Sequence, residues 1–224
     1  MNILAAKVLI GSYLLGSVPF GLIAGYAFKR IDIRQYGSGN IGATNVLRLL
    51  GWPAAILVFL LDTAKGFVPV WIAQACELDP LVVAGAAIAS ILGHNCSVFL
   101  GFKGGKGAAT SLGAVIGIAP HIAAVTFFIW VLVVTVTRYI SVGSMVAGVC
   151  VPVLMWLSSR LQDSYLSRPY PAEYIYLALF GAGFILLKHK SNLMRLASGV
   201  EPRIGQRIDV GKGGPKSPPE SGKR

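Results

Sequence analysis

The sequence has few charged residues for its length and very few acidic ones. Charged residues make up only 13% of the 224 positions, with 9 Asp and Glu against 20 Lys and Arg, while hydrophobic residues reach 54%. Mean hydropathy is +0.67. A soluble domain of this size cannot hide so much apolar surface, so the composition indicates a polytopic membrane protein. The net charge of +11 then fits cytoplasmic loops beside anionic lipid better than a nucleic-acid surface.

Cysteine is also scarce. Cys76, Cys96 and Cys150 form an odd set without metal-ligand spacing, and each lies in or beside an apolar run. We interpret them as packing residues, which argues against a disulfide framework, a metal site and a cysteine nucleophile. Lys7 interrupts the first apolar run and no convincing cleavage site follows, so we expect no cleavable signal peptide.

Long apolar runs predict spanning helices, each of which needs about 20 apolar residues. The candidate runs are 3–28, 52–75, 81–100, 108–136, 141–157 and 172–187. Pro120 divides the longest run and favours two helices there. The basic stretch 29–48 and the basic tail from Lys188 onward should both be cytoplasmic by the positive-inside bias.

This charge distribution requires an odd number of spans. We therefore expect an all-α, polytopic membrane bundle of about seven spans, with five as the alternative, an outside N-terminus and a cytoplasmic C-terminus. Residues 1–205 should form the membrane-embedded domain. Residues 206–224 should form a basic, disordered cytoplasmic tail, because its Gly, Pro, Ser, Lys and Arg cannot build a core.

Three polar clusters lie on the predicted cytoplasmic side. The first cluster runs from Tyr36 to Asn45 and is followed by Arg48. Its three glycines favour a tight loop with exposed amides, and the Arg48 guanidinium suits a phosphate. The alternative is a plain turn followed by a helix with Thr44 as its N-cap. The candidate site residues here are Ser38, Gly39, Asn40, Thr44, Asn45 and Arg48.

The second cluster is a glycine- and lysine-rich loop, Gly101–Gly107, that leads directly into an apolar helix. Helix N-termini attract anions, and glycines let backbone N–H groups approach an oxyanion closely. The loop is not a nucleotide P-loop, because Gly107 and not Ser or Thr follows Lys106. The alternative is a flexible basic turn. The candidate phosphate-binding residues are Lys103, Gly104, Gly105, Lys106 and Gly107, together with His94 in the preceding span, which could equally be a packing histidine.

The third cluster begins at His189 and extends to Glu201. His189 and Asn192 are three residues apart, so they should face the same side of a helix. The alternative is an ordinary basic interfacial helix tethered by Glu201. Within the second span, Asp62 and Lys65 are also three apart and can form an ion pair on one helix face, which we interpret as structural.

Taken in order, these motifs resemble one family. The run Tyr13–Gly21, the first cluster, His94-Asn95 with Phe102–Thr110, and the third cluster are similar to PlsY-type acyl-phosphate:glycerol-3-phosphate acyltransferases of bacterial membranes. The resemblance covers about residues 2–205. It implies transfer of a fatty acyl group from acyl phosphate to the 1-hydroxyl of sn-glycerol 3-phosphate, giving lysophosphatidic acid and inorganic phosphate. This is the first acylation of phospholipid synthesis.

The resemblance also implies roles for individual residues. Ser38 and Arg48 should be essential, His189 and Asn192 should matter for activity, and Glu201 should be structural. Gly104, Gly105 and Gly107 should bind glycerol 3-phosphate. Since acyl phosphate is already activated, we expect no cofactor, metal ion or acyl-enzyme. Whether His189 or the acceptor's own phosphate takes the proton stays open.

The implied setting is the bacterial inner membrane, with the active site facing the cytoplasm. The expected partners are the two substrates, membrane lipid and the soluble phosphate acyltransferase PlsX, which would supply acyl phosphate. Two other functions fit the sequence less well. A coenzyme-A-dependent acyltransferase is disfavoured because no His is followed by Asp five residues later. An anion transporter is disfavoured because the clusters lie at one membrane face and no internal repeat is visible.

Overall fold

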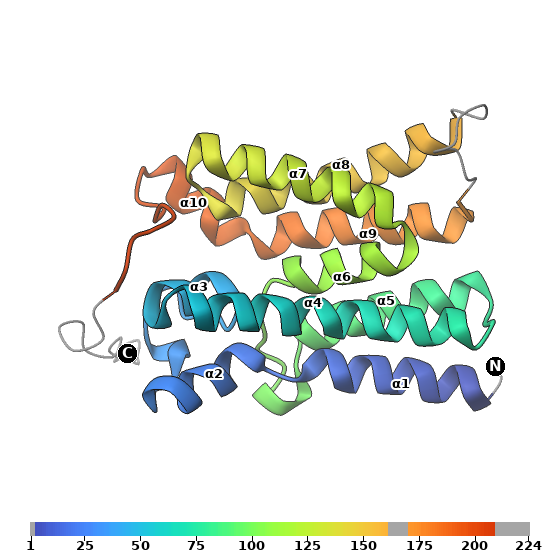
Figure 1. Ribbon diagram of the computed structural model, residues 1–224, viewed down its shortest axis with the longest axis horizontal. Coiled ribbons are helices and arrows are strands. Elements are labelled where there is room, and N and C mark those ends of the chain that lie inside the picture. Colours follow the sequence, from blue (N-terminus) through green and yellow to red (C-terminus); the bar gives the residue numbers. More distant parts are fainter. Residues whose placement is uncertain (1–2, 161–169, 209–224) are drawn as a thin grey trace, which may run out of the picture.

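The structure, a computed structural model, describes residues 3–160 and 170–208, and all regular elements within these ranges are helices. They are α1 (Ile3–Ser17), α2 (Phe20–Lys29), η1 (Ile33–Gln35), α3 (Ala43–Leu50), α4 (Trp52–Ala75), α5 (Pro80–Asn95), η2 (Val98–Leu100), α6 (Ala108–Ile118), α7 (Pro120–Thr137), α8 (Ile140–Arg160), α9 (Ala172–Lys188) and α10 (Lys190–Ala197). The long helices lie side by side along one axis (Figure 1). The expected all-α membrane bundle is confirmed.

Five helical segments in the described ranges are long and apolar enough to cross a membrane. They are Ile3–Lys29, Trp52–Ala75, Pro80–Leu100, Pro120–Thr137 and Ile140–Arg160. The helices α6 and α9, with 11 and 17 residues, pack among them but are shorter than the ~20 residues of a typical span, so the choice between seven spans and five stays a prediction. Large apolar side chains such as Phe128 and Val136 are exposed on the outside of the bundle, as expected for surfaces that face lipid.

Proline determines two breaks in the apolar runs. Pro120 begins α7 directly after Ala119 ends α6, as the sequence predicted. The first run was expected to form one helix over 3–28, and this was wrong in detail. It breaks at Val18 and Pro19, between α1 and α2, because proline has no N–H with which to continue the helical hydrogen bonds. The side chain of Lys65 crosses from α4 and donates to the Val18 carbonyl at 2.9 Å.

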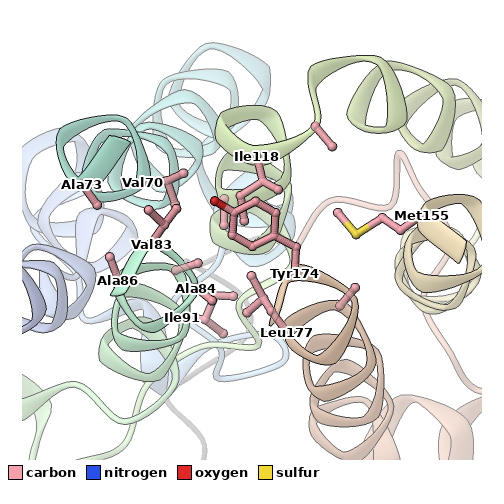
Figure 2. Packing of buried hydrophobic residues seen from close by; sticks show 14 of the residues in the cluster. Val70, Ala73, Val83, Ala84, Ala86, Ile91, Ile118, Met155, Tyr174 and Leu177 are labelled. Carbon is pink, nitrogen blue, oxygen red and sulfur yellow. The ribbon is translucent and has the colours of Figure 1, made fainter. Parts of the chain in front are cut away.

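Small residues hold the neighbouring helices close together. A Cβ added at Gly113 of α6 would lie 1.9 Å from the Thr63 carbonyl oxygen of α4, and one added at Gly66 would lie 1.9 Å from the Thr110 carbonyl oxygen. Such close approach between backbones is typical of membrane helix pairs. It fixes the N-terminus of α6 against the middle of α4. Deeper in the bundle the core is aliphatic, with Tyr174 at its centre (Figure 2).

The described C-terminal segment folds back over one end of the bundle. The Ile204 N–H donates to the Arg138 carbonyl at 2.8 Å, and the Ile208 N–H donates to the Arg48 carbonyl at 3.0 Å. The Ile208 side chain packs on the core cluster formed by α2, α3 and α4. Ile208 therefore contacts the bundle, and the domain boundary expected at 205 stays a prediction. Residues 209–224 of the expected tail lie outside the described residues.

Candidate active site

A cavity of about 180 Å³ is lined in part by residues of α3 and α10, two helices that lie at the same end of the bundle (Figure 1). Its lining includes members of all three clusters, which are far apart in the sequence: Ser38, Asn40, Thr44, Asn45, Arg48, His94, Lys106, Gly107, His189, Asn192 and Glu201. Asp62 lines it as well. Gly39, Lys65, Lys103, Gly104 and Gly105 are not part of the lining. The fold thus gathers most of the candidate residues around one space.

The first cluster forms a turn that is built around the buried Asn45 side chain. Asn45 accepts a hydrogen bond from the Ser38 N–H at 3.0 Å and donates to the Ile33 carbonyl at 3.0 Å. Gly37 has φ +59°, and a Cβ there would lie 2.4 Å from Asn45 Oδ1. Asn45 therefore holds the loop in shape. Ser38 lines the cavity, and its hydroxyl oxygen accepts a long hydrogen bond from the Asn40 N–H at 3.4 Å. Gly39, with φ +72°, completes the turn.

The alternative of an N-cap at Thr44 was wrong. The helix α3 is capped by Gly42 and begins at Ala43, so Thr44 lies in its first turn and lines the cavity. Asn40 accepts a hydrogen bond from the Gly42 N–H at 2.8 Å. This contact shapes the entry into α3, and Arg48 follows on the same helix.

The glycine-lysine loop uses its glycines differently from the prediction. The N–H groups of Gly104 and Gly105 are not free for an anion, because they donate to the carbonyls of Asn95 at 3.2 Å and His94 at 2.9 Å. A Cβ at Gly105 would lie 2.0 Å from His94 Nε2. Both glycines are thus needed for close packing against the end of α5. Gly107, Ala108 and Ala109 line the cavity at the start of α6, where the first-turn N–H groups lack helical acceptors.

The two lysines of this loop have different environments. Lys103 is exposed and does not line the cavity, which argues against its expected role in binding phosphate. Lys106 enters the cavity and donates to the Asn192 side-chain oxygen. Burial first, and then the positive charges of Arg195 and Arg48, lower the pKa of the Lys106 amine to about 8, while Glu201 opposes this shift.

Lys106 and Arg48 leave the cavity with excess positive charge. Among the described residues neither forms an ion pair with a carboxylate, since the observed ion pairs join Arg34 to Asp32, Asp62 to Lys65, and Arg195 to Glu201. The Arg48 guanidinium donates to the Pro202 carbonyl at 3.4 Å, a long contact with a neutral acceptor. A concave space with two such cations favours a ligand of high negative charge.

The third cluster is organised around the Glu201 carboxylate. It accepts hydrogen bonds from the Asn192 amide at 2.6 Å, the Ser141 hydroxyl at 2.8 Å and Arg195 Nε at 2.7 Å. Burial alone would raise the pKa of Glu201, but these hydrogen bonds hold it below its ordinary value. Glu201 thereby orients the Asn192 amide, whose oxygen receives the Lys106 amine. Ser141 was missed in the sequence because nothing near it suggests a polar partner.

His189 lies at the junction of α9 and α10 and lines the cavity. Its Nδ1 is 2.8 Å from the Ile185 carbonyl oxygen, so Nδ1 carries a proton and donates. Burial, reinforced by the charge of Lys106, lowers the pKa of the ring to about 4, although the bond to Ile185 acts in the opposite direction. At neutral pH the ring is uncharged, and Nε2 is a hydrogen-bond acceptor.

The Asp62–Lys65 pair lies fully buried below the loop. Lys65 Nζ is 2.8 Å from Asp62 Oδ1, with side-chain exposures of 1% and 3%. His94 Nδ1 is 3.7 Å from the same oxygen. His94 in turn packs against Gly105. The buried side chains of Lys65, Asp62 and His94 therefore lie in succession between the break that separates α1 from α2 and the glycine-lysine loop.

Away from these polar groups the cavity wall is apolar. Leu112, Val115, Phe127, Trp130 and Val151 line this side, between α6, α7 and α8. Sequence reasoning did not single out these residues, because apolar side chains in spanning helices carry no signal that separates a cavity wall from lipid contact. The cavity is thus amphipathic, with cations and hydrogen-bonding groups at one side and a hydrocarbon-like surface at the other.

The model of one protein family, described as glycerol-3-phosphate acyltransferase, matches residues 6–199. The chain belongs to the glycerol-3-phosphate acyltransferase family. A relative so named from Synechococcus sp. (strain JA-3-3Ab) is 44% identical over 198 residues, covering 88% of this chain and 92% of the relative. One from Thermus thermophilus is 42% identical over 206 residues, covering 92% and 98%.

A solved structure agrees with this family assignment. The glycerol 3-phosphate form of PlsY, an integral membrane glycerol 3-phosphate acyltransferase, matches with a TM-score of 0.82 and 38% sequence identity, covering 90% of this chain and 96% of that one. Its lysophosphatidic acid form matches with a TM-score of 0.80. This chain, as a family member, is therefore an integral membrane protein, and the resemblance drawn from its motifs is confirmed.

Proposed function

We propose that this protein transfers a fatty acyl group from acyl phosphate to the 1-hydroxyl of sn-glycerol 3-phosphate. The products are 1-acyl-sn-glycerol 3-phosphate and inorganic phosphate. The observation that carries this proposal is the amphipathic cavity, where Arg48 and Lys106, which pair with no carboxylate of the described chain, lie beside a hydrocarbon-like wall. Both substrates carry phosphate and one carries a fatty chain, so together they match both sides of the cavity.

The polar side offers two groups of anion-binding donors. One consists of Arg48 with the Ser38 hydroxyl, and the other consists of Lys106 with the first-turn amides of α6. The charges of Arg195 and Arg48 help to lower the pKa of Lys106, and a bound phosphate dianion would act in the opposite direction. Binding two phosphates side by side is therefore most favourable when both cations are present.

In the reaction the acceptor hydroxyl oxygen forms a bond to the acyl carbonyl carbon. The bond from that carbon to the phosphate oxygen breaks, and the phosphate leaves with the electron pair. His189 Nε2 can accept a hydrogen bond from the hydroxyl and orient it. With a pKa of about 4 His189 is a weak base, whereas a phosphate monoester has its second pKa near ~6. We therefore assign the proton to the acceptor's own phosphate and orientation to His189.

The proposed setting is the bacterial inner membrane, with the cavity open to the cytoplasm. The C-terminal end of α2 and the helices α3 and α10, which carry Lys29, Arg48 and Arg195, lie at the same end of the bundle as the cavity (Figure 1). By the positive-inside bias this is the cytoplasmic side. A soluble phosphate acyltransferase such as PlsX would deliver acyl phosphate there.

The donor experiment tests the proposed function. Purified protein is incubated with glycerol 3-phosphate and either hexadecanoyl phosphate or hexadecanoyl-coenzyme A, without ATP and with a metal chelator. Lysophosphatidic acid should form with acyl phosphate and at most at a trace rate with acyl-coenzyme A. A reaction without the protein provides the background rate. Comparable rates with both donors would show that the donor has been assigned incorrectly.

A second prediction concerns Gly105→Ala. The added methyl would lie 2.0 Å from His94 Nε2, so the loop or the ring must move and Lys106 moves with it. We expect the Michaelis constant for glycerol 3-phosphate to rise about tenfold, the effect of weakening a charge-assisted contact by ~1.4 kcal/mol. The constant for acyl phosphate should change little. Steady-state kinetics with each substrate varied in turn measures both.

Gly101→Ala is the control for this variant, since a Cβ there meets nothing within 4 Å. It places a methyl in the same loop, at a φ of +59° that Gly105 does not share, so it reports a general disturbance of the loop without the contact to His94. Equal kinetic effects at both positions would mean that contact with His94 does not position the loop.

A further inference from the structure

A second, smaller cavity lies next to the first and has an almost entirely apolar lining. Its volume is about 40 Å³. Ser111, Val115, Gly148, Val151 and Ile185 line both cavities, so the two share walls on α6, α8 and α9. Within the described part of the chain, Tyr174 adds the one further polar group to its lining. Such a space disfavours phosphate groups and suits hydrocarbon.

The second cavity extends away from the polar groups. Along α8 its lining runs from Gly148 to Met155, about 10 Å at ~1.5 Å per residue. Along α6 it runs from Ser111 to Ile118, and along α9 from Ile185 back to Tyr174. On all three helices these residues continue the wall of the first cavity toward the opposite end of the bundle.

Two large buried side chains lie at the far end. Tyr174 of α9 projects toward Ile118 of α6, and Met155 of α8 points toward Tyr174 (Figure 2). Met155 is 1% exposed and Tyr174 is 8% exposed. Between them and the active-site cavity the wall of α9 consists of small residues, namely Ala178, Gly181 and Ala182, with Leu177 at the far end. The space is therefore narrow and apolar, and it ends at Met155 and Tyr174.

We propose that this second cavity receives the methyl end of the fatty acyl chain and that Met155 and Tyr174 limit its length. This inference rests on the proposed acyl transfer and adds a chain-length limit to it. A chain whose carbonyl lies beside Lys106 and His189 enters along the shared wall of the two cavities. Each methylene that the cavity holds adds favourable burial of apolar surface. A chain too long for the cavity must either strain the cavity walls or leave part of its length outside.

Two glycines of α9 supply a matched pair of variants. A Cβ built at Gly181 or at Gly183 meets nothing within 4 Å, so both positions tolerate a larger side chain. Gly181 lines the second cavity, whereas Gly183 is exposed on the outside of the bundle. Gly181→Leu should fill the cavity. Gly183→Leu adds the same side chain to the same helix, but on the exposed face of the bundle, so it is the control.

The experiment compares kcat/KM for hexadecanoyl and decanoyl phosphate. In Gly181→Leu the ratio of long to short donor should fall about tenfold, the loss of roughly two buried methylenes. In Gly183→Leu it should equal that of the wild-type protein. Met155→Ala should shift the ratio the opposite way, toward longer chains, because it removes part of the cavity's end. If all three variants keep the wild-type ratio, the chain end lies elsewhere and the inference fails.

The outcome is separable from that of the proposed function. If the wild-type protein prefers acyl-coenzyme A, the donor assignment fails, and the same ratio is then measured with coenzyme A thioesters of both lengths. If Gly181→Leu is poorly folded, Ala178→Val narrows the same cavity, with Leu179→Val on the exposed face as its control. A reduced rate for both chain lengths with an unchanged ratio would also overturn the inference, because it would indicate a general structural effect.

Discussion

Replacing Asp62 by Asn is expected to destabilise the fold by about 3–5 kcal/mol, because it leaves a buried charge without its partner. Lys65 lies 2.8 Å from Asp62 with 1% of its side chain exposed, so neither water nor lipid headgroups can replace the carboxylate. Its remaining hydrogen bond is to the Val18 carbonyl at the break between α1 and α2. Thermal unfolding of the purified protein in detergent should show a much lower midpoint than that of the wild-type protein.

The double variant Asp62→Asn, Lys65→Met separates the charge from the shape of the pair. It removes both charges and keeps side chains of similar length, so it should recover most of the lost stability. Activity should recover less, because Val18 loses its donor and His94 loses the nearby carboxylate. If Asp62→Asn alone is as stable as the wild-type protein, the ion pair does not stabilise this bundle.

The bundle could be predicted largely from local features of the sequence. Apolar runs locate the spanning helices, and Pro120 separates α6 from α7 because a proline cannot extend the preceding helix. The spacing of Asp62 and Lys65 fixes their common face through the period of the α-helix. The break at Pro19 was missed. The carbonyl of Val18 at this break finds its donor in Lys65, which lies on another helix, and such a contact cannot be read from the local sequence.

The sequence predicted which types of residue form the site, but not which of them contact one another. Glycines and cations marked all three clusters, yet the sequence could not show that Lys106 and not Lys103 enters the cavity. That choice depends on how the loop packs on α5, where Gly105 touches His94. Ser141 was missed for the same reason, because its partner Glu201 is 60 residues away in the chain.

Arg48→Lys is expected to reduce kcat/KM for glycerol 3-phosphate at least tenfold, or ~1.4 kcal/mol, although the positive charge is kept. Lysine lacks the planar fork that can contact two phosphate oxygens, and its single amine cannot also hold the Pro202 carbonyl. Steady-state kinetics measures the loss. Arg34→Lys is the control. Arg34 lies near the same loop but outside the cavity, where it pairs with Asp32, so this variant should behave as the wild-type protein.

The pH dependence of Arg48→Ala tests whether the charges of Arg48 and Lys106 interact across the cavity. Burial lowers the pKa of Lys106 to about 8, and the charges of Arg195 and Arg48 contribute to this shift. As pH rises through this value Lys106 loses its proton, so kcat/KM should fall on the alkaline side. Removing Arg48 removes a repulsive charge, and the pKa of Lys106 should rise. The alkaline limb should therefore move to higher pH in this weakly active variant. If Lys106→Met removes the alkaline limb but Arg48→Ala leaves its position unchanged, the charge of Arg48 does not act on Lys106.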